Sequence, residues 1–172
     1  MQNENNLPIV TEFDATTILS LNYIKNYLRI DNNCDDDFLQ NALLVAISYA
    51  EKITGYILGT KTLKTTITLK TATQKLNDFP FIINEIISIT NNGEALQATQ
   101  YQLSNGNILF TKQTSGTIEI EFKTGISATS IPQDIKQAIL QHIATMYQNK
   151  NGNYTIPQAV QNTYSQYKNI RI

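Results

Sequence analysis

The chain has 172 residues, of which 41% are hydrophobic, and this length is enough to bury a core as one domain or as one domain with an insertion. Its 13 Lys and Arg residues and 14 Asp and Glu residues leave a formal net charge of -1, which argues against a dedicated DNA-binding domain with a basic surface. A single cysteine, Cys34, excludes an internal disulfide bond and a cysteine-based zinc site, and no apolar run approaches a membrane span, so we expect no membrane partner.

Residues 1–16 are polar and rich in asparagine, and we expect them to form an N-terminal arm outside the folded core. A first helix follows, with Ser20 as its N-cap and with apolar residues on one face. A second, longer helix carries an alanine-rich apolar stripe. It ends at Gly55, because glycine suits the left-handed conformation that closes many helices.

The segment "DNNCDDD", residues 31–37, separates these two helices. Carboxylates at the start of a helix interact favourably with its free backbone N–H groups. The segment also invites a calcium interpretation, but counting from Asp31 places Asp36 and Ala42 where an EF-hand loop needs glycine and glutamate. We therefore interpret the segment as helix capping and expect no metal site.

Residues 61–124 change from a helical period to a period of two, as in "TLKTTITLKT" and "GTIEIEFKTG". Asn92–Gly93 ends one predicted strand, and Asn105–Gly106 marks a hairpin turn, since both central turn residues need positive φ. This pattern predicts a small antiparallel meander of about four or five strands.

A third helix begins near Pro132, and a short fourth one follows Pro157. The predicted fold class is therefore α+β, with a bundle of about four helices from residues 17–60 and 125–172 and the meander of residues 61–124 inserted into it. The helix-packing core is predicted to contain Ile24, Leu28, Leu39, Leu43, Ala46, Ala50, Ile135, Ile139 and Ile143.

The sequence contains no recognisable catalytic constellation. His142 is the only histidine, and neither it nor Cys34 has a nucleophile or base at a motif spacing. We interpret His142 as a residue at the edge of the helical core, bonded to backbone or water, and Cys34 as a packing residue. We expect no enzymatic activity and no cofactor.

Two groups of residues are candidate contact surfaces. Lys61, Lys64 and Lys70 lie in one predicted strand, either as an edge that faces DNA or as the lysines that keep an edge strand from pairing with other chains. The C-terminal tail combines tyrosines with basic and apolar residues, a mixture enriched at protein interfaces, although it could also pack on its own bundle. Its candidate docking residues are Tyr164, Tyr167, Lys168, Ile170, Arg171 and Ile172.

Two stretches, in the same order along the chain, resemble the head-tail connector (adaptor) family of tailed phages, in its longer branch with a β insert. The first has the pattern K-x-Y-L-R-I-D, an acidic cluster and the helix end A-E-x-x-T-G, in Lys25, Tyr27, Leu28, Arg29, Ile30, Asp31, Asp35 to Asp37, Ala50, Glu51, Thr54 and Gly55. The second has P-x-D-I-K-x-A-I-L and a following aromatic residue, in Pro132, Asp134, Ile135, Lys136, Ala138, Ile139, Leu140 and Tyr147.

The resemblance implies a structural subunit without catalytic residues, in a ring of about twelve copies beneath the portal protein. Such a ring would extend the DNA channel, let double-stranded DNA pass without sequence specificity, and dock the stopper or tail-completion protein. The protein would belong to the virion neck, assembled in the cytoplasm of a bacterial host. The alternative function is a small nucleic-acid-binding module that assists DNA packaging through the lysine-bearing strand.

Overall fold

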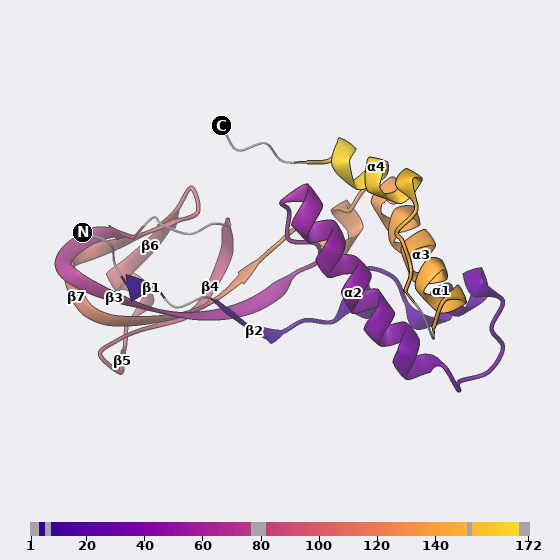
Figure 1. The fold of residues 1–172 in the computed structure, drawn as a ribbon. Coiled ribbons are helices and arrows are strands. Elements are labelled where there is room, and N and C mark those ends of the chain that lie inside the picture. Colours follow the sequence, from indigo (N-terminus) through magenta and orange to yellow (C-terminus); the bar gives the residue numbers. More distant parts are fainter. Residues whose placement is uncertain (1–3, 6–7, 77–81, 151–152, 169–172) are drawn as a thin grey trace. The chain divides into compact units, whose positions relative to one another are not determined.

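A computed structural model describes residues 4–5, 8–76, 82–150 and 153–168. The chain divides into two compact units, which Figure 1 draws coloured in chain order. A sheet unit contains Met1–Phe13 and Thr60–Gly125, and a helical unit contains Asp14–Gly59 and Ile126–Ile172. Residues 4–5 and 9–12, part of the expected N-terminal arm, pair within the sheet unit.

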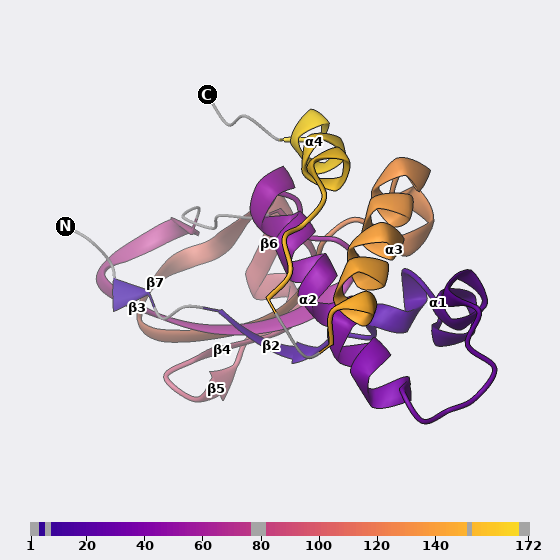
Figure 2. The same ribbon diagram turned by 45° about the vertical axis from the view of Figure 1, so that its right-hand side comes forward.

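The helical unit contains four α-helices and two short 3-10 helices among its described residues. They are η1 (Ala15–Thr17), α1 (Leu21–Leu28), α2 (Asp36–Thr54), η3 (Ala128–Ser130), α3 (Gln133–Gln148) and α4 (Gln158–Gln166). Figure 2 shows α2 and α3 side by side, with α1 and α4 packed near them. Helices from the two ends of the chain thus complete one unit.

Local chemistry explains several helix ends. The Ser20 hydroxyl accepts a hydrogen bond from the Tyr23 N–H (3.2 Å) and so caps α1 as predicted. Gly55 closes α2 with φ 73°, also as predicted. Pro132, near which α3 was expected to begin, occupies its N-cap position, where no side chain caps the helix.

All four helices contribute buried apolar side chains to the helical core. Leu28 is half-buried, whereas the other eight residues expected in this core are buried. Backbone atoms also connect the two chain segments of the unit, because the Ile126 N–H donates to the Ile57 carbonyl (3.0 Å) next to a parallel bridge between Leu58 and Ile126. The sheet unit is inserted between these two segments.

In the described residues, the sheet unit is one antiparallel sheet of seven strands. They are β1 (Glu4–Asn5), β2 (Ile9–Glu12), β3 (Lys61–Leu76), β4 (Ile83–Asn91), β5 (Glu94–Ala95), β6 (Tyr101–Ser104) and β7 (Asn107–Thr124). The order is β1-β3-β7-β4-β5, with β2 also on β3 and β6 also on β7. The long central pair β3–β7 runs from Lys61 opposite Thr124 to Leu76 opposite Ile108.

The predicted fold class was wrong, because the sheet dominates the protein and is no small insert in a helical bundle. Two features escaped the sequence pattern. The central strands are 16 and 18 residues long, and two further strands come from the expected N-terminal arm. Strand β2 is exposed throughout, so it shows no alternation of apolar and polar residues by which it could be recognised.

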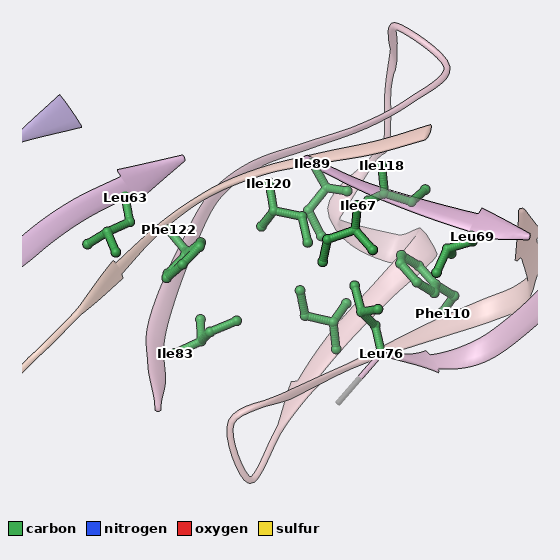
Figure 3. Close-up of a cluster of buried hydrophobic side chains, with 11 residues drawn as sticks. Leu63, Ile67, Leu69, Leu76, Ile83, Ile89, Phe110, Ile118, Ile120 and Phe122 are labelled. Carbon is green, nitrogen blue, oxygen red and sulfur yellow. The ribbon is translucent and has the colours of Figure 1, made fainter. Parts of the chain in front are cut away.

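The sheet curls around an apolar core of its own (Figure 3). Side chains from β3, β4 and β7, such as Ile67, Ile89 and Phe122, point toward one another in this core and are almost fully buried. Asn105–Gly106 forms the predicted hairpin turn between β6 and β7, with φ of 50° and 74°. Among the helices of the described residues, none has the length and apolar character needed to cross a membrane.

Candidate functional site

His142 lies on the buried side of α3, among aromatic rings. Its ring lies edge-on to Tyr49, with ring centres 5.3 Å apart, and near Tyr154. Burial lowers the pKa of His142 and therefore favours the neutral ring. Within the described part of the chain, neither ring nitrogen has a hydrogen-bond partner, and the same holds for the buried Tyr164 hydroxyl. The imidazole is thus deeper in the core than expected, surrounded by aromatic groups.

The acidic segment before α2 forms ion pairs with two lysines. Asp35 occupies the N-cap position without a capping hydrogen bond from its side chain. Its carboxylate instead accepts hydrogen bonds from the Lys150 ammonium (2.6 Å) and the Tyr147 hydroxyl (2.8 Å), at the end of α3. These two hydrogen bonds lower the pKa of Asp35, and the bond from Lys150 has the larger effect. Nowhere in the described ranges do three His, Cys, Asp or Glu side chains gather as a metal site would require.

A second ion pair ties the start of α2 to α1. The Lys25 ammonium donates to Asp36 (2.9 Å) and to Asn33 (2.5 Å). The predicted capping role of the segment is therefore replaced by two lysine contacts that join α2 to its neighbours. Sequence reasoning missed these contacts because the partner lysines lie 11 and 115 residues away.

The three lysines of the candidate DNA-facing edge lie on β3, which is not an edge strand. β3 pairs with β7 on one side and with β1 and β2 on the other. Lys64 forms an ion pair with Glu119 (3.2 Å), and the Lys61 ammonium lies 4.4 Å from the centre of the Phe13 ring. Lys70 is exposed. Of the three, Lys64 is thus paired with a carboxylate, which weakens its attraction for phosphates.

The candidate docking tail divides into three parts. Tyr164, on α4, is fully buried and contributes to the helical core. The half-buried Tyr167 donates its hydroxyl to Asp134 (3.2 Å), and Lys168 is exposed. Ile170, Arg171 and Ile172 lie outside the described residues.

The helical unit also exposes apolar and aromatic side chains that the sequence analysis had not named as contact residues. On α1 these are Tyr23 and Tyr27, and on α2 they are Leu44 and Val45, all more than 40% exposed. They alternate with the buried positions at helical spacing, which is the only signal in the sequence that could have identified them.

Comparison with known proteins gives a family model and a shared fold. A model of the head completion protein family matches residues 17–169. No curated protein matches the chain. Two solved chains with the same fold come from necks of gene transfer agent (GTA) particles. The first, from the neck of an empty particle computed with C6 symmetry, has a TM-score of 0.68 and 19% identity, and the match covers 100% of this chain and 97% of that one.

The second, from the neck of a native particle computed with C12 symmetry, has a TM-score of 0.65 and 18% identity, with coverage of 100% and 97%. A third chain, from the virion of a native gene transfer agent particle, has a TM-score of 0.71 and 17% identity, with 97% of both chains covered. At sequence identities this low, the TM-scores establish a common fold alone. The matches cover both units of this chain.

Proposed function

Because this chain belongs to the head completion protein family, we propose that it is a structural subunit of the neck of a tailed phage or prophage particle. In this proposal several copies form a ring beneath the portal protein, prolong the DNA channel, and dock the stopper or tail-completion protein. The observation that carries the proposal is the family match over residues 17–169, joined to a fold likeness that spans nearly the whole of neck proteins.

A ring requires each subunit to carry two different surfaces that contact each other in neighbouring copies. The exposed apolar residues on α1 and α2 support this requirement, because they supply two unlike apolar surfaces on one subunit. A low charged fraction of 16% also supports close packing of many copies, since like charges repel weakly at the contacts. The relatives' necks were computed with C6 and C12 symmetry, which supports a ring of six or a multiple of six for this chain.

A channel through which DNA slides must not hold phosphates tightly, because each phosphate contact adds affinity. On the solvent-facing side of β3 and β7, positive and negative side chains balance each other. Lys64 pairs with Glu119, and Lys123 pairs with Glu85 (2.9 Å) on the same face. This balance supports passage of DNA without binding, and it weighs against the alternative of a nucleic-acid-binding module that assists packaging.

The C-terminal end is proposed to reach the portal. Tyr167 and Lys168 follow α4, and the remaining candidates, Ile170, Arg171 and Ile172, come shortly after them in the sequence. Tyrosine, arginine and apolar side chains together are well suited to anchoring in a partner's pocket.

Electron microscopy of the purified protein mixed with the portal protein of the same phage or prophage tests the proposal. We expect a ring of extra density on one end of the portal. Class averages should show this ring closed, with a fixed number of subunits. The portal alone, and the portal with an unrelated protein of similar size, are the controls. If the portal stays bare at protein concentrations well above those of the portal, the neck-subunit proposal fails.

A further inference from the structure

The solvent-facing side of α2 is unusually apolar for its position. Leu44 is 45% exposed and Val45 is 48% exposed, on the side of the helix opposite its buried stripe. The nearest exposed neighbours one turn away, Asn41 and Ser48, are uncharged. Charges occur on this side only toward the two ends of the helix. We call this surface, Asp37 to Lys52 along the exposed side of α2, the α2 face.

Helix α1 exposes a second surface of similar character. Tyr23 is 47% exposed and Tyr27 is 43% exposed, and their spacing of four residues places them on one side of the helix. Asn22 and Asn26 lie beside them and are also exposed. We call this surface, from Asn22 to Arg29, the α1 face. Tyrosine is enriched at the centres of protein interfaces because it buries a large area with few rotatable bonds.

Arg29 adds a second, independent observation. It ends α1 in the left-handed conformation, with φ 59°, where glycine or asparagine is the usual residue because other side chains are strained there. Its side chain is exposed and has no ionic or hydrogen-bonded partner among the described residues. The same holds for the exposed Asp37, at the start of the α2 face. Two unpaired charges of opposite sign thus lie at the C-terminal end of the α1 face and at the N-terminal end of the α2 face.

We propose that the α1 face of one copy docks on the α2 face of the next copy, with the two helices antiparallel. Arg29 then pairs with Asp37, and Tyr23 covers Leu44 and Val45. This inference rests on the proposed function, because it assigns the subunit contact of the proposed ring. The two faces are unlike, so the contact is heterologous and can close into a ring.

The dimensions of the two faces agree with this pairing. At a rise of about 1.5 Å per residue, Tyr23 and Arg29 lie about 9 Å apart along α1, while Val45 and Asp37 lie about 12 Å apart along α2. The long arginine side chain spans the difference. Between these ends, Tyr27 faces Asn41, whose side-chain amide can bond the phenol hydroxyl.

Cross-linking between differently labelled copies tests the contact directly. In a Cys34→Ser background, one copy carries Tyr23→Cys and the other carries Val45→Cys, and the two are mixed and assembled on the portal. Oxidation is expected to join one copy of each kind, which a tag on one variant makes visible. The control replaces Tyr23→Cys with Gln141→Cys, an exposed position on α3, and is expected to give no cross-link.

A charge exchange gives a second reading. Arg29→Asp is expected to lower ring assembly on the portal by on the order of tenfold, and Arg29→Asp with Asp37→Arg is expected to restore most of it. Circular dichroism checks that each variant folds. If rings form but neither the cross-link nor the rescue occurs, the inference fails while the proposed function stands. If no ring forms with the unmodified protein, the proposed function fails, and the inference with it.

Discussion

Gly116 illustrates how a single residue shapes the sheet. It lies within β7 with φ 98°, and a Cβ atom built on it would lie 2.4 Å from the side-chain oxygen of Asn92. That oxygen accepts the N–H of Thr117 (2.9 Å), and the N–H of Asn92 in turn donates to the Thr117 carbonyl (2.7 Å). The side chain of Asn92 therefore replaces part of the strand ladder, and only glycine leaves room for it.

We expect Gly116→Ala to lower the free energy of unfolding by about 2–3 kcal/mol, through backbone strain and displacement of Asn92. Gly93→Ala is the matched control. Its φ of 86° gives comparable strain, but nothing lies within 4 Å of the new Cβ atom, so its cost is expected to be about half as large. Urea denaturation measures both, and equal losses would contradict the steric role of Asn92.

His142 and Tyr164 show what the interior of the helical unit tolerates. Both are fully buried, and both lie against Tyr49, at 5.3 Å and 6.1 Å between ring centres. Burial lowers the pKa of His142 and raises that of Tyr164, so the neutral form of each ring is favoured. Packing of these neutral rings against Tyr49 makes both residues part of the helical core.

At the scale of elements, the protein depends on contacts between helices that are remote in sequence. The Asp35 carboxylate joins the start of α2 to Lys150 and Tyr147 after and within α3. The Lys150 ammonium also lies over the Tyr147 ring, 3.9 Å from its centre. The start of α2 and the end of α3 are thereby held together by a charged contact.

We expect Asp35→Asn to lower the melting temperature at pH 7, because it removes the charge that Lys150 and Tyr147 contact. The lowered pKa of Asp35 means that the folded state binds its proton less readily than the unfolded state, so this stability exists above the ordinary carboxyl pKa and is lost as pH falls through the lowered value. The difference from the unmodified protein should therefore shrink toward pH 3.

Asp37→Asn provides the control for this series. Asp37 lies in the same helical turn but has no hydrogen-bond or ionic partner in the described part of the chain. Melting curves of the unmodified protein and both variants between pH 3 and pH 7 make the comparison. A loss that is the same at both ends of this range would show that the ion pair does not stabilise the folded state.

At the scale of the whole molecule, two units with separate cores share one chain. The sheet unit takes up the chain between Gly59 and Ile126, so the helical unit is assembled from two segments that are far apart in the sequence. Helix α4 contributes Val160 and Tyr164 to the helical core, and the segment after Tyr167 is proposed to reach the portal. Core and docking segment are therefore adjacent in the sequence and can be separated by truncation.

Removing residues 168–172 is expected to leave the melting temperature nearly unchanged and to weaken portal attachment by on the order of tenfold. Removing residues 164–172 is expected to cost about 3 kcal/mol of stability or more, since it deletes the buried Tyr164. Calorimetry and co-sedimentation with the portal distinguish the two effects. If the variant without residues 168–172 still binds the portal fully, the docking residues lie elsewhere in the chain.

The sequence by itself determined the local elements whose signals are short-range. Helical spacing identified the long helices, the Ser20 and Gly55 ends follow from backbone capping, and Asn105–Gly106 specifies its turn through positive φ. Only the tertiary structure decided the rest. Three features depend on partners elsewhere along the chain. They are the pairing of residues 4–5 and 9–12 with β3, the ion pairs of Asp35 and Asp36, and the burial of His142 and Tyr164. Hydrogen-bond ladders and ion pairs form between whichever groups the fold brings together, and no periodicity in the sequence records those partners.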